Sequence, residues 1–168
     1  VDVIPIMRRL QDGQVITQFD YPSCEELGLL KMDFLGLRNL DVIEDALAII
    51  RETHGEAPDI DNVALDDDAT LAMLRRGESI GVFQLEGGPM RALMRSLAPT
   101  SFDDIAALVA LYRPGPMGAN MHNDYADRKN GRKPVEYFHP DAEEVLADTY
   151  GLMIYQESVM RVAQKFAG

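Results

Sequence analysis

Lys31 and Asp33 are the two residues whose types and spacing are best suited to chemistry. They lie in a short apolar run, residues 29–34, between Gly28 and Gly36. Successive side chains of a β-strand point to opposite faces, so a strand here would place Lys31 and Asp33 on the same face. A carboxylate can bind a divalent metal ion, and a lysine beside it can contact a phosphate on that ion. An ordinary surface ion pair is the alternative, and the spacing alone favours it.

Three further groups of charged residues have structural explanations beside their chemical ones. Arg113 lies within the run 112–116, at the expected end of a helix, where it can cap carbonyl groups or contact a phosphate. The acidic run 66–68 stands where a helix is expected to begin, which favours a helix start over a metal site. Glu157 likewise lies in the expected first turn of the last helix.

The composition argues against several classes of protein. The chain has 168 residues and a formal net charge of −12, which disfavours a broad basic surface for nucleic acid. Only residues 87–133 hold a clear excess of basic over acidic side chains, so DNA binding by this chain alone would have to use them. Cys24 is the single cysteine and the three histidines lie far apart, so we expect no internal disulfide, zinc cluster or catalytic triad.

The cellular setting is also indicated by the sequence. There is no run of about 18 apolar residues and no signal-peptide pattern at the start, so we expect a cytoplasmic protein with no membrane partner. The first residue is not Met, and a helical pattern continues to the last residues, which suggests a piece of a longer chain. A piece of a domain leaves apolar faces without partners, so self-association is also expected.

The spacing of apolar residues predicts an α+β protein that is mainly helical. Two short runs, 15–19 and 29–34, have the composition of β-strands, and we expect two or three strands in this first part. From residue 39 onward the apolar residues recur at helical spacing and predict about six helices. The clearest helix begins near Asn39 and ends at Gly55.

Four blocks of sequence, in order, resemble one family. The blocks are KMDFLGLR at 31–38, GVFQLE at 81–86, ALYRPGP at 110–116, and TYG with YQE within 149–157. They resemble the bacterial C-family DNA polymerases, the alpha subunit of DNA polymerase III, and the resemblance covers essentially the whole chain. It implies that residues 1–38 are the last strands of a palm domain and that residues 39–168 are the first half of a fingers domain.

The resemblance also implies roles for Lys31 and Asp33. Asp33 matches the third of three catalytic aspartates that hold two Mg²⁺ ions, and Lys31 matches a lysine that contacts the triphosphate of the incoming nucleotide. The parent enzyme would add deoxynucleotides to a primer 3′ end, with primer-template DNA and dNTP as substrates. A sliding clamp, a clamp loader and a proofreading exonuclease would be its partners.

The chain alone is expected to be inactive. The other two aspartates and an arginine-rich part of the fingers domain have no counterpart in these 168 residues. A nonenzymatic helical interaction module, in which the acidic middle segment docks a protein, stays the alternative to a polymerase.

Overall fold

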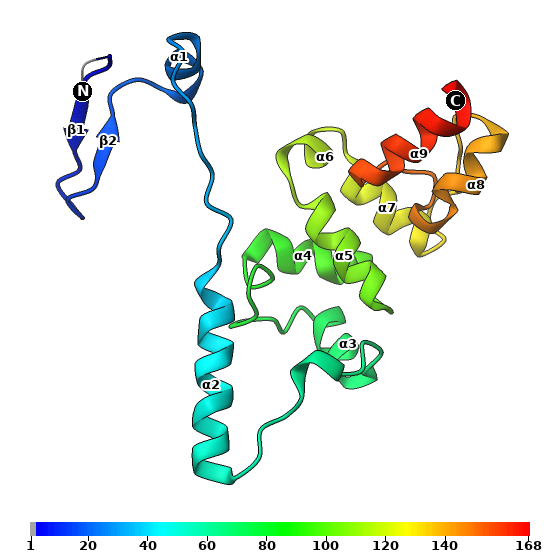
Figure 1. Ribbon diagram of the computed structural model, residues 1–168. Coiled ribbons are helices and arrows are strands. Elements are labelled where there is room, and N and C mark those ends of the chain that lie inside the picture. Colours follow the sequence, from blue (N-terminus) through cyan, green and yellow to red (C-terminus); the bar gives the residue numbers. More distant parts are fainter. Residues whose placement is uncertain (1–2) are drawn as a thin grey trace. The chain divides into compact units, whose positions relative to one another are not determined.

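The computed structural model describes residues 3–168 and divides the chain into two compact units, Val1–Asp59 and Ile60–Gly168. The described residues form two strands and nine α-helices, so the α+β, mainly helical class is confirmed (Figure 1). More helices form than the six or so expected, because short ones such as α1 (Tyr21–Glu26) and α6 (Pro114–Gly118) have too few residues to show a helical period.

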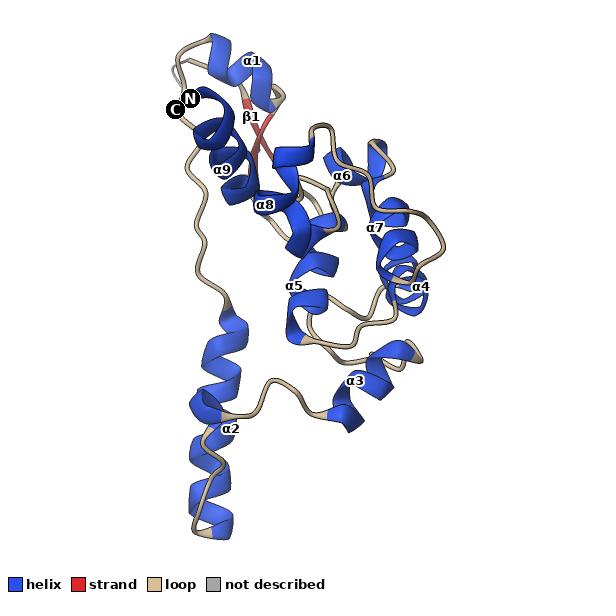
Figure 2. Cartoon of the chain, turned by 90° about the vertical axis from the view of Figure 1, so that its right-hand side faces the viewer, coloured by secondary structure: helices blue, strands red, loops and turns tan. Residues whose placement is uncertain are grey.

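The N-terminal unit begins with a β-hairpin, drawn in red in Figure 2. Strand β1 (Ile6–Arg8) pairs antiparallel with β2 (Val15–Thr17), and Ile6 lies opposite Thr17. The predicted strand at 15–19 is therefore confirmed in its first three residues. Gly13 has a φ of 73° in the connecting turn, a conformation that glycine adopts without steric cost.

The second predicted strand, at residues 29–34, does not form. This segment is extended but irregular, and it pairs with no strand among the described residues. Its preceding helix, α1, ends at Glu26, and a backbone hydrogen bond joins the Leu29 amide to the Cys24 carbonyl (3.0 Å). An apolar run can satisfy its backbone as a strand only where a partner strand is available, which explains why the prediction was wrong.

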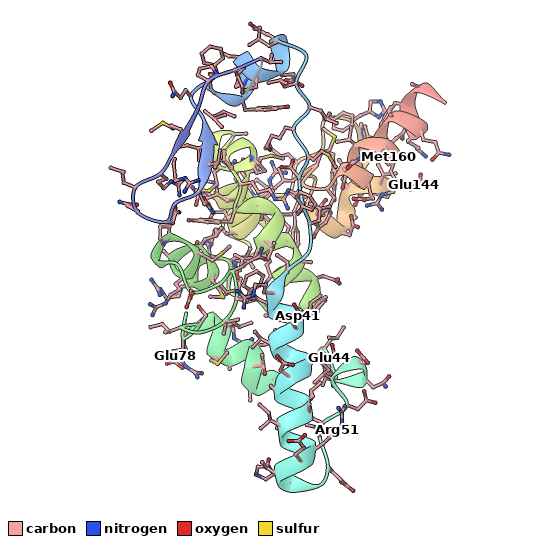
Figure 3. The ribbon with its side chains drawn as sticks, turned by 60° about the vertical axis from the view of Figure 1, so that its left-hand side comes forward. Asp41, Glu44, Arg51, Glu78, Glu144 and Met160 are labelled. Carbon is pink, nitrogen blue, oxygen red and sulfur yellow. The ribbon has the colours of Figure 1, made fainter. Side chains whose placement is uncertain are left out.

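Helix α2 (Arg38–His54) confirms the clearest prediction from the sequence. Gly55 ends it with a φ of 85°, as expected of a C-cap glycine. Asp41, Glu44 and Arg51 project from it in Figure 3. Although its sequence is amphipathic, α2 contains no buried residue in the described structure, and Leu40 is 68% exposed. The apolar face of α2 is thus available for packing.

The C-terminal unit is helical throughout. Its elements are, in order, η1 (Ile60–Asn62), α3 (Asp68–Arg75), α4 (Gly88–Leu97), α5 (Phe102–Leu111), α6 (Pro114–Gly118), α7 (Met121–Lys129), η2 (Pro140–Ala142), α8 (Glu143–Leu146), η3 (Ala147–Thr149) and α9 (Gln156–Ala167). Helix α4 packs against α3, α5 and α7. It therefore lies at the centre of this unit.

The helix boundaries follow the capping residues of the sequence. The Asp67 carboxylate accepts a hydrogen bond from the Thr70 amide (2.7 Å), so the acidic run 66–68 is a helix start, as predicted. Ser101 caps α5 by accepting from the Asp104 amide (3.3 Å). Side-chain oxygens at these positions satisfy amides that have no partner within the helix.

One apolar core holds these helices together. Leu97, Leu108 and Leu111 are fully buried and come from α4 and α5. The other buried members of the cluster are Leu74, Leu85, Met90, Leu93, Met94, Ala107, Tyr125, Ala126 and Ile154. Because the cluster extends from α3 to the segment before α9, it stabilises the C-terminal unit as one body.

A buried ion pair lies beside this core. The Lys129 ammonium is 3.3 Å from the Asp104 carboxylate, and their side chains are only 7% and 5% exposed. Asp104 also accepts hydrogen bonds from the amide and the hydroxyl of Thr100 (2.7 and 3.0 Å). Lys129 donates to the Ala98 carbonyl (3.0 Å). The pair therefore joins α5, α7 and the loop that follows α4.

A second polar link joins the end of α7 to the chain before α9. Arg128 donates to the carbonyl oxygens of Glu136 (3.1 Å) and Tyr150 (2.8 Å). The next residue, Gly151, has a φ of 80°, and a Cβ there would overlap the Glu136 carbonyl oxygen. Glycine is therefore required where these two segments approach each other.

We predict that Leu108→Ala lowers the free energy of unfolding by about 2–5 kcal/mol, because it removes buried methyl groups and leaves a cavity. Met160→Ala in α9 is the control, since Met160 is 61% exposed (Figure 3) and its loss should cost less than about 0.5 kcal/mol. Urea unfolding followed by circular dichroism measures both, and equal effects would contradict the assigned core.

Asp67→Ala should lower the thermal unfolding midpoint more than Asp66→Ala does, because only Asp67 accepts the helix-capping hydrogen bond. The hydrogen bonds from Thr70 lower the pKa of Asp67 from its ordinary value of 3.8. A lowered pKa stabilises the fold above the unfolded-state pKa, and this contribution disappears as the pH falls through the folded-state value. The thermal unfolding midpoints of Asp67→Ala and Asp66→Ala should therefore converge as the pH is lowered from neutral to acidic. A difference between these two midpoints that persists in acid would argue against the cap.

Candidate functional site

The structure brings Lys31 and Asp33 into contact. The Lys31 Nζ is 2.8 Å from Oδ1 of Asp33 and donates to Oδ2 at 3.2 Å. The two side chains are 53% and 66% exposed, so solvent and solutes reach both of them. They lie on the same side of the chain as expected, although the segment that carries them is irregular. The contact is compatible with both hypotheses from the sequence, the surface ion pair and the metal and phosphate site.

Tyr21 is a neighbour of Lys31 that the sequence analysis did not single out. The Lys31 ammonium lies 5.1 Å from the centroid of the Tyr21 ring, a cation–π distance. Tyr21 is the first residue of α1, where Asp20 accepts from the Ser23 amide (3.3 Å) and Pro22 occupies the first turn. This cap and proline were available in the sequence as a signal for α1.

The Lys31 ammonium is held in its charged form. The hydrogen bond to Asp33 and the charge of that carboxylate raise the pKa of Lys31 above its ordinary value of 10.5, and Tyr21 adds to the effect. Lys31 therefore carries a full positive charge at neutral pH. An exposed cation of this kind can neutralise a phosphate without a proton transfer.

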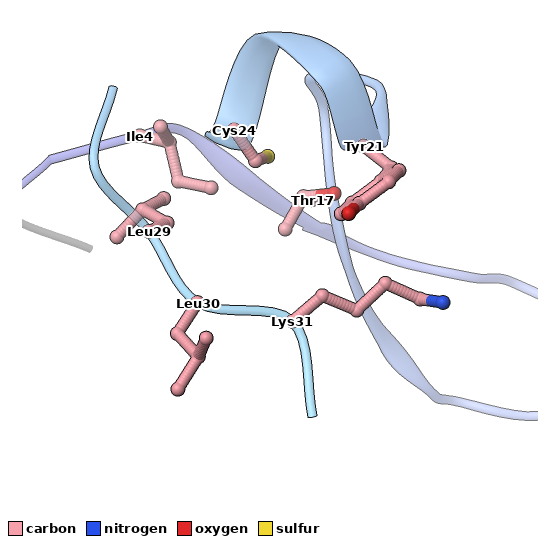
Figure 4. Close-up of a pocket in the computed structure, with 7 residues that line it drawn as sticks. All are labelled: Ile4, Thr17, Tyr21, Cys24, Leu29, Leu30 and Lys31. Atoms are coloured by element: carbon pink, nitrogen blue, oxygen red, sulfur yellow. The ribbon is translucent and has the colours of Figure 1, made fainter. Parts of the chain in front are cut away.

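Lys31 and Tyr21 also border a hollow of the N-terminal unit, shown in Figure 4. The hollow measures about 430 Å³, and its remaining lining residues are Ile4, Thr17, Cys24, Leu29 and Leu30. Its walls are mostly apolar, and Cys24 is a free thiol within it. The hollow can receive an uncharged group while Lys31 contacts an anion at its edge.

The basic residues of segment 87–133 are mostly engaged within the protein. Five of the seven have partners inside the C-terminal unit. Two of them donate to carbonyl oxygens: Arg91 to Gly77 (2.7 Å) and Arg128 to Tyr150 (2.8 Å). The other three form ion pairs with carboxylates: Lys129 with Asp104 (3.3 Å), Arg132 with Asp127 (2.7 Å) and Lys133 with Asp124 (2.8 Å). Much of the local positive charge is thus neutralised or directed inward.

Arg113 and Arg95 have no side-chain hydrogen bond or ion pair recorded among the described residues. The described structure therefore shows no capping of carbonyl groups by the Arg113 side chain, one of the two roles considered for it from the sequence. Arg113 instead precedes Pro114, at the start of α6. Glu157 lies in the first turn of α9, as predicted.

Two of the three histidines make local contacts within residues 3–168. His54 contacts the Thr53 hydroxyl (2.7 Å), and His139 accepts from the Asp141 amide (3.2 Å), so both have local roles. Across the same residues, no three side chains of His, Cys, Asp or Glu are grouped to hold a metal ion. Nor does any helix there have the length and apolar content needed to cross a lipid bilayer.

Two family models together match all but two residues of the chain. Residues 39–168 match the finger domain of the bacterial DNA polymerase III alpha subunit, and residues 1–36 match the model described as its NTPase domain. The chain belongs to the bacterial DNA polymerase III alpha subunit family. The family predicted from the four sequence blocks is therefore confirmed. The division into palm (1–38) and fingers (39–168) stays a prediction. The sequence boundary of the two compact units falls elsewhere, between residues 59 and 60.

Several curated DNA polymerase III alpha subunits are similar over nearly the whole chain. The subunit of Mycobacterium leprae is 58% identical over 99% of this chain, and that of Halalkalibacterium halodurans is 48% identical over 95%. The subunit of Thermus aquaticus is 47% identical over 99%. The chain spans 14% of the length of each of these relatives. These 168 residues thus correspond to a small part of each DNA polymerase III alpha subunit.

We predict that Asp33→Asn lowers the pKa of Lys31 toward its ordinary value, because the variant removes the negative charge that favours the ammonium. Side-chain NMR of the lysines across an alkaline titration measures the shift. Asp12→Asn is the matched control, since Asp12 forms a similar exposed pair with Arg9 (3.1 Å). An unchanged Lys31 titration in Asp33→Asn would show that the ion pair does not form in solution.

Proposed function

We propose that this chain is part of a replicative DNA-directed DNA polymerase, which adds deoxynucleotides to a primer 3′ end. The observation that supports the proposal most is the 58% identity to a DNA polymerase III alpha subunit over 99% of the chain. Because the chain spans 14% of that relative, the activity belongs to a longer protein in this proposal. Primer-template DNA and dNTP are its substrates.

Asp33 is proposed as a ligand of the catalytic Mg²⁺ ions. Its carboxylate suits a hard divalent cation, and it is two-thirds exposed with a single recorded partner, Lys31. One carboxylate cannot hold two ions, so further oxygen ligands must come from outside the described residues. Bound Mg²⁺ supplies a Lewis acid that activates the primer hydroxyl and offsets the charge of the leaving pyrophosphate.

Lys31 is proposed to contact the triphosphate of the incoming nucleotide. Its ammonium is charged at neutral pH and lies beside the proposed metal ligand, so it can donate to a phosphate oxygen close to that ligand. Before the nucleotide binds, Asp33 and the Tyr21 ring hold the ammonium in place. This arrangement limits the conformational entropy that Lys31 loses on binding.

The chain on its own is proposed to be inactive, since it supplies one carboxylate and one lysine of the site. Membership of the polymerase family disfavours the alternative of a nonenzymatic interaction module. Replisome proteins such as a sliding clamp, a clamp loader and a proofreading exonuclease are proposed as partners of the longer protein, which acts in the cytoplasm. The exposed apolar residues of α2 support self-association of the chain when it is alone.

In a full-length polymerase that carries this segment, Asp33→Asn should reduce the rate of nucleotide incorporation at least about a hundredfold, because a group that stabilises developing charge is lost. Lys31→Ala should raise the KM for dNTP roughly tenfold, because one charge-assisted phosphate contact is lost. Single-turnover primer extension with Mg²⁺ separates the two effects.

Asp12→Asn serves as the control for these variants, because it removes an exposed carboxylate of the same unit that also pairs with a basic residue. It should leave incorporation unchanged. Near-normal incorporation by Asp33→Asn would rule out the proposed role of Asp33, and an unchanged KM in Lys31→Ala would rule out the phosphate contact.

A further inference from the structure

A hollow in the C-terminal unit, bordered by α4, α6 and α7, has no role in the polymerase chemistry proposed above. Both α4 and α6 pack against α7 (Figure 1). The hollow measures about 300 Å³, at the lower end of the range of small-molecule pockets, roughly 300–1,000 Å³. Its lining includes Ala92 and Ser96 of α4, Tyr112 at the C-cap of α5, Met117 of α6, and His122 and Asn123 of α7.

Tyr112 gives the hollow a flat wall that is held in place. Its side chain is partly buried and packs against the apolar core of the unit. A ring fixed in this way loses little conformational entropy when a second ring stacks on it. Ala92 and Met117, which is 37% exposed, add apolar surface to the same hollow. The apolar part of the hollow therefore suits a planar ring.

His122 gives the hollow a hydrogen-bond donor. Its Nδ1 is buried and has no hydrogen-bond partner within residues 3–168. The other ring nitrogen, Nε2, has no hydrogen bond recorded in the described chain either, but it is not buried. A neutral imidazole carries one proton, and a buried N–H without an acceptor costs free energy. The proton is therefore favoured on Nε2, from which it can be donated to a ligand.

Two further polar groups belong to the same lining. Asn123 donates from Nδ2 to Oδ1 of Asn120 (2.7 Å), which leaves its own Oδ1 as an acceptor. The Tyr112 hydroxyl can both donate and accept. The edge of a nucleobase presents donors and acceptors side by side, so it can pair with such groups. An apolar protein side chain in the hollow would leave them without partners, at a cost in free energy.

Two arginines lie next to the hollow. Arg113 follows Tyr112 directly, its side chain is exposed, and it has no hydrogen bond or ion pair recorded among the described residues. Arg132 pairs with Asp127, but it also donates to the carbonyl oxygen of Ser96 (3.0 Å) and remains 46% exposed. A ligand that carries negative charge beside its ring is therefore favoured.

We propose that this hollow binds one unpaired base of single-stranded DNA. The base stacks on Tyr112 and its polar edge meets His122 and Asn123. The phosphates on either side of the base lie near Arg113 and Arg132. The choice of an unpaired base rests on the hollow itself, because a base within a duplex is stacked on both faces and cannot enter it. The choice of DNA rests on the proposed polymerase function.

Fluorescence anisotropy at low salt, with a short labelled oligothymidylate as the probe, tests the proposal. An abasic oligomer of the same length keeps the phosphates but has no bases. It should bind at least about fivefold more weakly, because base–aromatic stacking is lost. In NMR spectra, the ring signals of His122 should shift and saturate as the oligothymidylate is added. Those of His54 and His139, which do not line the hollow, should stay in place.

Two variants test the residues of the hollow. Ala92→Trp places a large side chain in the hollow and should weaken binding of the oligothymidylate at least about fivefold. Ala69→Trp is the matched control, because Ala69 is exposed on α3 and does not line the hollow, and it should bind as the unaltered chain does. His122→Phe keeps a ring but removes the donor, so it should weaken binding about threefold. Thermal unfolding midpoints verify that each variant is folded.

The proposal is overturned if the abasic oligomer binds as tightly as the oligothymidylate, since phosphate contacts alone would then account for the affinity. It is also overturned if the His122 signals do not move, or if a folded Ala92→Trp chain binds as well as Ala69→Trp. These measurements do not depend on nucleotide incorporation. Their failure would therefore leave the proposed polymerase function standing, and loss of that function would leave the binding result unchanged.

Discussion

The C-terminal unit depends on a buried ion pair at the edge of its apolar core. Asp104 lies in the first turn of α5 and Lys129 at the end of α7, so the pair fixes the distance between these two helices. Thr100 and the Ala98 carbonyl satisfy further hydrogen bonds of the two charged groups. Burying two charges is costly in free energy, and it is tolerated here because the Lys129 ammonium and Oδ2 of Asp104 each have several polar partners. Loss of either group would leave the other uncompensated inside the protein.

The N-terminal unit is built in a different way. Lys31 and Asp33 lie on a segment with no strand partner among the described residues, and α2 exposes its apolar face to solvent. Few contacts within this unit therefore oppose local rearrangement. The proposed site of Lys31 and Asp33 therefore lies on a segment that few contacts hold in place, in a chain that spans 14% of the length of a relative.

The sequence predicted those features whose causes are local. Gly55 ends α2 and the acidic run 66–68 begins α3 where expected, because a cap depends on a few adjacent residues. Residues 29–34 were predicted as a strand because an apolar run does not reveal whether a partner strand exists. The contact of Lys31 with Asp33 followed from their spacing, but its pairing with Tyr21 could not, since it depends on how α1 folds back.

Gly151 determines how closely two segments of the C-terminal unit approach each other. Any side chain at this position would push against the Glu136 carbonyl oxygen, which shares Arg128 as a hydrogen-bond donor with the Tyr150 carbonyl. Tyr150 in turn rests edge-on against the Tyr125 ring. The absence of a methyl group at position 151 thus lets one guanidinium join two stretches of backbone that lie far apart in the sequence.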